Sequence, residues 1–176
     1  MREDAVEMGF APLPNESGFY EWDLDGYVVS TDRRRLDLAT IERFLSRESY
    51  WGRGLSRDAI VRSINGSLAF GVHDGAGQVA FCRVITDLAR VAYLLDVYVD
   101  AAHRGRQIGT QLSAIVRTHP DLATVKRWLL VTPDAAGVYS RTGWSTAAEP
   151  GQIMEIVGDD PARADLRRLF PSRRTG

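Results

Sequence analysis

Nine consecutive residues, VAYLLDVYV at Val91–Val99, constrain the fold more than any other segment of the chain. The run is apolar at almost every position, so it lacks the alternation typical of a strand with one face in water. Strands of this kind lie at the centre of a sheet that is covered on both faces. We therefore expect a central β-strand here, with other elements packed on either side of it.

Amphipathic segments on both sides of this run are candidates for the covering helices. Asp37 and Ser56 are good N-cap residues, and each precedes apolar residues at helical spacing. Gly66 would end the second of these helices. A third amphipathic pattern begins at Ile108 and ends before Pro120.

Shorter β patterns surround the central run. Further strands are predicted at 26–30, 68–72, 79–85, 126–131 and 153–157. The turn Asp74-Gly75-Ala76-Gly77 joins two of them into a hairpin. Asp134 is a plausible N-cap for a short helix that reaches Thr142.

Composition excludes several classes of function. The 176 residues fit one globular domain, and 22 Lys and Arg residues nearly balance 23 Asp and Glu residues. No strong field would therefore attract nucleic acid or an anionic membrane surface. No apolar run approaches the ~20 residues that span a bilayer, and no secretory signal pattern opens the sequence. The single cysteine, Cys82, excludes an internal disulfide, and we expect a cytoplasmic protein.

The segment between the central run and the third helix has the composition of an anion site. It reads HRGRQIGT at 103–110, with two glycines and two arginines. A helix N-terminus presents unpaired N–H groups and a positive dipole end, which suit a pyrophosphate, and glycine lets the backbone approach closely. Arg104 and Arg106 would add charge-assisted hydrogen bonds. Taken alone, such a loop is more often structural or solvated.

The run LLDVYVDAAHRGRQIGTQL resembles the acetyl-CoA-binding motif of GNAT N-acetyltransferases, in which a strand leads to (Q/R)-x-x-G-x-(G/A) at a helix start. The segment TPDAAGVYSRTGW is similar to the family's later strand-helix-strand element, and residues 50–87 resemble the helix pair and hairpin of one bacterial branch. The resemblance spans roughly residues 27–156.

This resemblance implies an α/β (α+β) fold of the GNAT type. Its central sheet is mixed and mostly antiparallel, is flanked by helices on both faces, and parts near Asp96 so that CoA can enter. The implied organisation is an irregular N-terminal extension at 1–23, a GNAT domain at 24–159 and a C-terminal tail at 160–176.

The activity implied is transfer of acetyl from acetyl-CoA to a primary amine of a small molecule, peptide or protein, by direct attack in a ternary complex. No metal is implied, and homodimers are common in the family. The loop with Tyr50, Trp51 and Arg53 lies where family members often border the acceptor pocket. Its aromatic residues could contact a substrate or only pack the core.

Two catalytic candidates follow from the resemblance. Tyr139 matches the family's tyrosine, whose phenol can protonate the departing thiolate. Asp96 stands where the family often has an acid that serves as a base, and a structural aspartate that fixes the backbone is nearly as good an interpretation. Period-two geometry places Asp96 on the same face as Leu94 and Tyr98.

The candidate acetyl-CoA-binding residues lie at the end of the central strand and in the loop after it. Backbone groups of Val97 and Val99 would bind the pantetheine arm, and the loop would bind the phosphates. These candidates are Val97, Tyr98, Val99, Arg104, Gly105, Arg106, Gln107, Ile108, Gly109 and Thr110.

One loop position departs from the family pattern. Gln107 replaces the first motif glycine, whereas Arg104 and Gly109 match. If the backbone there needs a positive φ, the Cβ of Gln107 costs stability or displaces the phosphates. Either the loop adapts and binds acetyl-CoA more weakly, or the domain is a non-catalytic acyl-CoA-binding or regulatory module. A partner-binding scaffold is a third alternative, and we favour the first because the other elements match.

Overall fold

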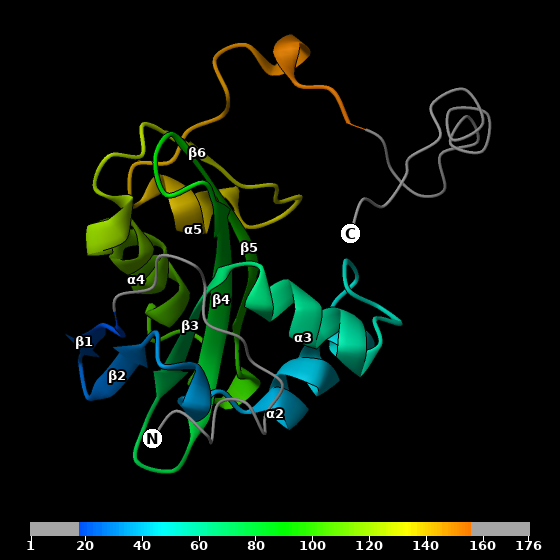
Figure 1. Ribbon diagram of the computed structural model, residues 1–176, viewed down its shortest axis with the longest axis vertical. Helices are drawn as coiled ribbons and strands as arrows, with labels where there is room; N and C mark the ends of the chain where they lie inside the picture. Colours follow the sequence, from blue (N-terminus) through cyan, green and yellow to red (C-terminus); the bar gives the residue numbers. More distant parts are fainter. Residues whose placement is uncertain (1–17, 156–176) are drawn as a thin grey trace, which may run out of the picture. The chain divides into compact units, whose positions relative to one another are not determined.

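A six-stranded sheet organises the protein, whose computed structural model describes residues 18–155. Its strands follow one another in chain order: β1 (Glu21–Leu24), β2 (Tyr27–Ser30), β3 (Leu68–His73), β4 (Gln78–Thr86), β5 (Val91–Val99) and β6 (Arg127–Leu129) (Figure 1). All neighbours are antiparallel except β5 and β6, which are parallel. The predicted mixed, mostly antiparallel sheet is confirmed.

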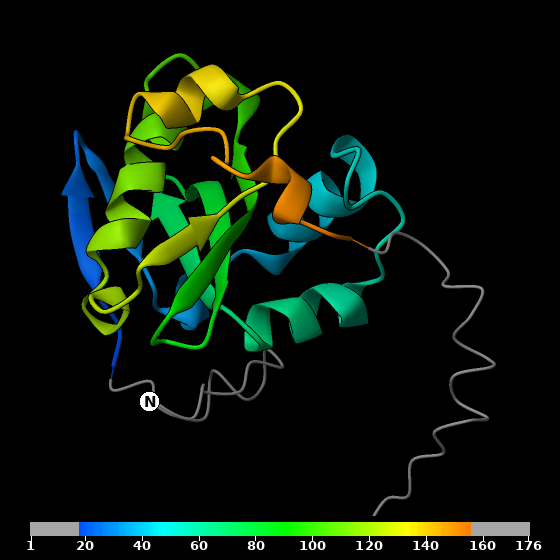
Figure 2. The same ribbon diagram turned by 90° about the horizontal axis from the view of Figure 1, so that it is seen from above.

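Helices cover both faces of this sheet, as predicted (Figures 1 and 2). On one face, α2 (Leu38–Arg43) and α3 (Arg57–Asn65) pack apolar side chains on Phe81 and Tyr98. On the other face, α4 (Ile108–Ile115) packs on the larger apolar core, and α5 (Ala136–Ser140) lies beside α4. The central strand β5 is therefore covered on both sides, which explains its apolar sequence.

The helix starts on the first face follow their capping residues. The side chain of Asp37 accepts a hydrogen bond from the Thr40 N–H, and that of Ser56 accepts one from the Ala59 N–H. Both predicted caps are confirmed. A π-helical turn, Phe44–Glu48, continues α2 and leads into the loop before α3.

The prediction that Asp134 caps the short helix is wrong. The N-cap of α5 is Ala135, whose N–H donates to the Thr132 hydroxyl at 3.0 Å. The side-chain contact at this helix start comes from Thr132 rather than Asp134, and the helix ends at Ser140 rather than Thr142.

The sheet begins earlier than the sequence patterns indicated. Asp25 and Gly26 have φ values of 45° and 88°, as a two-residue hairpin turn between β1 and β2 requires. Residues from Glu21 onward therefore belong to the sheet, and an irregular extension reaching residue 23 is too long. Residues 1–17 and the predicted tail at 160–176 lie outside the described residues.

Residues from Ser145 onward form a separate unit. In its described part, 145–155, the regular structure is a 3-10 turn at Pro150–Gln152. The strand predicted near 153–157 is absent at 153–155, and its last two residues lie outside the described range. Among the helices within residues 18–155, none is long and apolar enough to cross a bilayer.

A buried histidine joins the β1 edge to the segment after α4. The His119 ring packs against Tyr20 at 4.7 Å between centroids and against Trp22 and Phe70 at about 6 Å. Its Nδ1 accepts the Asp121 N–H at 3.2 Å. Burial lowers the pKa of His119, and the carboxylate of Asp121 opposes this only in part.

Stability should therefore fall when His119 is driven to protonate. Because the folded pKa lies below the unfolded value of about 6.5, the stability is complete above that pH and is lost as the pH falls below it. In urea unfolding at pH 7.5 and 5.5, His119→Phe should lose much of this pH dependence. An unchanged difference between the two pH values would assign the effect to other groups.

Candidate active site

The sheet parts between β5 and β6. The two strands pair from Val91↔Arg127 to Tyr93↔Leu129, and within the described residues β6 pairs with no later part of β5. Backbone groups on this edge of residues 94–99 therefore have no neighbouring strand in the part of the chain that the structure describes. The last β5 residue paired with β6 is Tyr93, three residues before Asp96, and parting of the sheet was expected near Asp96.

Asp96 lies at a β-bulge of the central strand. Arg83 of β4 opposes Leu95, and Phe81 opposes Tyr98, so β5 spans this interval with one more residue than β4. Asp96 has a φ of 52°, in the left-handed region that a non-glycine residue seldom adopts. The bulge re-aims the backbone at the point where the sheet opens.

The extra residue overturns the predicted alternation. Leu94 packs in the core on the α4 side, whereas Tyr98 stacks on Phe44 at the opposite face, with ring centroids 4.2 Å apart. Asp96 therefore cannot share one face with both Leu94 and Tyr98. Period-two counting fails because it assumes a strand without a bulge.

Both carboxylate oxygens of Asp96 have a hydrogen-bond donor. Arg83 Nε donates to Oδ2 at 2.5 Å, and the indole Nε1 of Trp51 donates to Oδ1 at 3.1 Å. The side chains of Asp96 and Arg83 are only 7% and 12% exposed. A charge this buried is tolerated when it is paired and hydrogen-bonded, so the contacts favour the structural interpretation of Asp96. Its role as a base stays a prediction.

The loop after β5 has the backbone that the motif requires. Gly105 has a φ of 79°, and Gln107, the N-cap of α4, has φ 61° and ψ 10°. The position of the family's first motif glycine does need a positive φ, and Gln107 adopts it despite a cost of about 1 kcal/mol. Its side chain forms no capping hydrogen bond, so no cap competes for the first N–H groups of α4.

The two loop arginines contact neutral oxygens. Arg104 Nε donates to the Val99 carbonyl at 3.1 Å, and Arg106 Nη1 donates to the Tyr27 hydroxyl at 3.0 Å. Neither forms a salt bridge with another described residue. Each guanidinium therefore keeps donors for an anion, as the binding prediction needs.

The start of α4 leaves room beside β5. A Cβ added at Gly109 would meet only Val99 Cγ2, at an ordinary 3.6 Å, so packing within the protein does not require glycine there. Free helix N–H groups, arginine donors and an open strand edge together fit the phosphates and the pantetheine arm of acetyl-CoA.

Tyr139 lies on α5, half-buried against the apolar core that also contains Cys82 and Trp144. Burial chiefly raises the pKa of its phenol to about 12, with smaller contributions from Cys82, Asp134 and Tyr50. The phenol is therefore protonated at neutral pH and can act as a proton donor. Burial also raises the pKa of the Cys82 thiol, so that this cysteine is an inert core residue.

Sequence reasoning did not pair Asp96 with Arg83 and Trp51. A signal was present, because β4 and β5 are adjacent apolar strands that each carry one charged residue of opposite sign near the same level. Two such charges must find partners, and each is the nearest candidate for the other. Among residues 18–155, no group of three or more His, Cys, Asp or Glu side chains could hold a metal ion.

Known proteins resemble this chain in sequence and in fold. A family model described as "Acetyltransferase (GNAT) domain" matches residues 65–146. A solved structure from Xanthomonas campestris pv. campestris, assigned to the GNAT family, is 40% identical and covers 77% of this chain and 96% of its own, with a TM-score of 0.73.

Two more distant matches agree with these. A Gibberella zeae protein named "Putative acetyltransferase" is 29% identical over 143 residues, which are 68% of this chain and 79% of that protein. A structure from Deinococcus radiodurans R1 is 17% identical with a TM-score of 0.59, covers 77% of this chain and 91% of its own, and supports the fold alone.

Replacing Gln107 by glycine should relieve backbone strain. In Gln107→Gly the left-handed conformation costs nothing, which offsets the greater entropy of the unfolded chain, so the free energy of unfolding should stay equal or rise by up to about 1 kcal/mol. The matched control Gln111→Gly lies inside α4 and should lose about 1 kcal/mol. If urea unfolding shows that both variants lose the same free energy of unfolding, the backbone at Gln107 is not strained.

The Arg83–Asp96 pair should show strong coupling. Asp96→Asn or Arg83→Met alone leaves a buried partner without its counter-charge and should cost about 3 kcal/mol of unfolding free energy. The double variant should cost less than the sum of the two single variants. A double-mutant cycle by urea unfolding measures this, and strict additivity would show that the pair is not energetically coupled.

Proposed function

This chain belongs to the GNAT family of acetyltransferases, and we propose that it transfers an acetyl group from acetyl-CoA to a primary amine by direct attack in a ternary complex. The observation that carries the proposal is the open edge of β5 beside the uncapped start of α4. Family members use acetyl-CoA as co-substrate, and this edge has the donors that such a molecule needs. The acceptor is a small molecule, a peptide or a protein.

Binding is assigned to two sets of groups. Main-chain groups of residues 97–99, at the unpaired edge of β5, hold the pantetheine arm and polarise the acetyl carbonyl. The loop residues hold the phosphates through N–H groups and guanidinium donors. These loop residues are Arg104, Gly105, Arg106, Gln107, Ile108, Gly109 and Thr110.

In the reaction, the amine nitrogen bonds to the thioester carbon, the C–S bond breaks, the amine loses a proton to solvent, and the departing thiolate gains one. We assign the last proton to the phenol of Tyr139, which its raised pKa keeps protonated. Asp96 holds the bulge through Arg83 and Trp51, so it acts as a positioning residue rather than as the base.

The left-handed backbone at Gln107 supports an active enzyme over a degenerate module. The sequence predicts that the Cβ of Gln107 costs stability or displaces the phosphates if a positive φ is needed, and the loop adopts that φ with Gln107 in place. Binding of acetyl-CoA without turnover of any amine would nevertheless select the non-catalytic alternative.

Thermal unfolding with and without millimolar acetyl-CoA tests binding first. Occupancy at 100 times Kd adds about 2.7 kcal/mol to the native state, which is a clear rise in midpoint for a domain of this size. A panel of primary amines, followed by release of the CoA thiol, then tests transfer. Absence of any shift would overturn the proposal.

Tyr139→Phe separates chemistry from binding. The variant should lower kcat by about 100-fold or more, because the general acid is lost, and should leave the acetyl-CoA-dependent rise in midpoint unchanged. Tyr20→Phe, in the aromatic group around His119, is the matched control and should keep full activity. Equal turnover in both variants would remove Tyr139 from the mechanism.

A further inference from the structure

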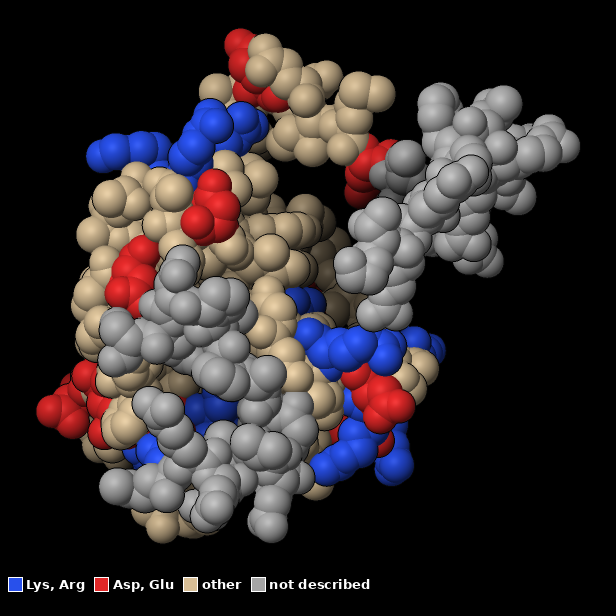
Figure 3. Space-filling view, viewed as in Figure 1, with Lys and Arg blue, Asp and Glu red and all other residues tan. Residues whose placement is uncertain are grey.

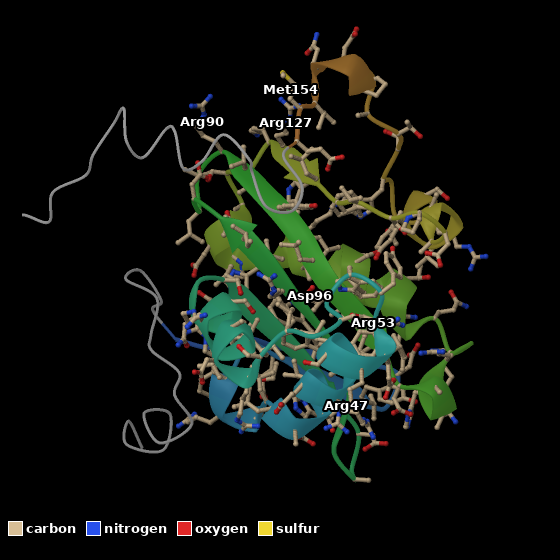
Figure 4. All side chains as sticks on the ribbon, turned by 90° about the vertical axis from the view of Figure 1, so that its right-hand side faces the viewer. Arg47, Arg53, Arg90, Asp96, Arg127 and Met154 are labelled. Atoms are coloured by element: carbon tan, nitrogen blue, oxygen red, sulfur yellow. The ribbon has the colours of Figure 1, made fainter. Side chains whose placement is uncertain are left out.

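The loop between α2 and α3, residues 49–55, borders the candidate active site; we call it the aromatic loop. Trp51 donates to Asp96 at the bulge of β5, and Tyr50 packs edge to face on Trp51. The loop thus reaches the bulged edge of β5 at the opening. Figure 4 views this side of the molecule, with Asp96 and Arg53 labelled (Figure 4).

Internal hydrogen bonds hold the aromatic loop in one conformation. The Ser49 hydroxyl donates to the Leu45 carbonyl at 2.7 Å and accepts the Gly52 N–H at 3.0 Å. The Gly54 N–H donates to the Ser46 carbonyl at 3.0 Å. A Cβ at Gly52 would lie 2.8 Å from the Leu45 carbonyl oxygen, so only glycine fits. The loop is therefore preorganised.

Two aromatic side chains of this loop face solvent. Tyr50 is 60% exposed and Trp51 is 47% exposed, and their rings meet edge to face at 4.8 Å. Phe44 packs behind Trp51 at 5.8 Å and fixes its ring. A large apolar surface held rigidly in water next to a catalytic centre is typical of a binding surface.

Two arginines add uncompensated positive charge to the same region. Arg47 and Arg53 are exposed, and neither forms an ion pair with another described residue. Figure 4 shows both on the side that carries Asp96, and Figure 3 shows basic side chains, with acidic ones among them, where α3 and the loop lie (Figure 3). Several other charged groups here form ion pairs with one another: Arg43 with Glu48, Arg57 with Glu42, and Arg83 with Asp96.

We propose that the acceptor is a small primary amine with an apolar or aromatic body and an anionic group, a carboxylate or a phosphate. Arg53 and Arg47 bind the anionic group, and Tyr50 and Trp51 contact the body. Guanidinium groups suit both anions because they donate two parallel hydrogen bonds. Since Arg83 already neutralises Asp96, the region carries net positive charge and disfavours a polycationic acceptor. The inference rests on the proposed acetyl transfer at this site.

Matched amines test the inference. The probes are 4-(aminomethyl)benzoate, the corresponding phosphonate and neutral 4-(aminomethyl)benzamide, which share the ring and the aminomethyl group. With acetyl-CoA as donor, at least one anionic probe should have a KM about ten-fold lower than the amide, with similar kcat. Comparison of the carboxylate probe with the phosphonate probe identifies which anion is preferred. Equal KM values for all three probes would overturn the inference.

Charge-reversal variants locate the effect. Arg53→Glu should abolish the preference for the anionic probe, and Arg53→Lys should retain part of it. Arg62→Glu is the matched control, because Arg62 is an exposed residue on α3 with no ion pair among the described residues. Loss of the preference in both glutamate variants would overturn the assignment to the aromatic loop.

A binding measurement keeps the two proposals distinguishable. In the presence of CoA, the N-acetylated benzoate should raise the thermal midpoint more than the N-acetylated amide, and Arg53→Glu should remove the difference. Equal midpoints in the wild-type protein would overturn the inference, even where acetyl-CoA itself binds. If acetyl-CoA does not shift the thermal midpoint, the proposed function fails. The comparison of the N-acetylated benzoate with the N-acetylated amide still decides whether the loop selects an anion.

Discussion

The contact of Asp96 with the largely buried Arg83 and with Trp51 is the interaction on which the candidate site depends. It lies at the one position where β5 carries an extra residue, and it holds a left-handed aspartate that would otherwise be unfavourable. The bulge reverses which face the following side chains occupy, so Tyr98 packs under α2 while Leu94 packs under α4. A single buried ion pair therefore fixes the conformation of the strand edge that faces the opening.

Three segments that are distant in sequence, β6, α4 and the aromatic loop, meet near that edge. β6 leaves β5 after Tyr93, which frees the edge, and α4 begins next to it at Gln107, whose side chain forms no cap hydrogen bond. The aromatic loop reaches the same place through Trp51 and is rigid because of its own hydrogen bonds. In the proposed arrangement the co-substrate binds along this edge and the acceptor binds at the aromatic loop, whose Trp51 contacts Asp96 directly.

Local signals in the sequence predicted much of this fold. The Ser56 cap, the 68–85 hairpin and the central strand depend on residues close together, and the structure confirms them. The Asp25-Gly26 hairpin signal was equally local and was overlooked. The bulge, and with it the contact of Asp96 with Arg83, could not be located by counting alternate residues. Alternation does not reveal where an extra residue enters a strand. The motif raised a positive φ at Gln107 as a condition, and the loop adopts that φ with the side chain in place, as the favoured interpretation requires.

Amide hydrogen exchange with and without acetyl-CoA measures binding at the proposed edge residue by residue. If acetyl-CoA lies along the open edge of β5, exchange should slow at residues 97–99 and at 105–110, while the β1–β2 hairpin at 21–30 stays unchanged. Protection confined to other parts of the chain, or no protection at a concentration that raises the thermal midpoint, would contradict the claim that acetyl-CoA binds along the open edge of β5.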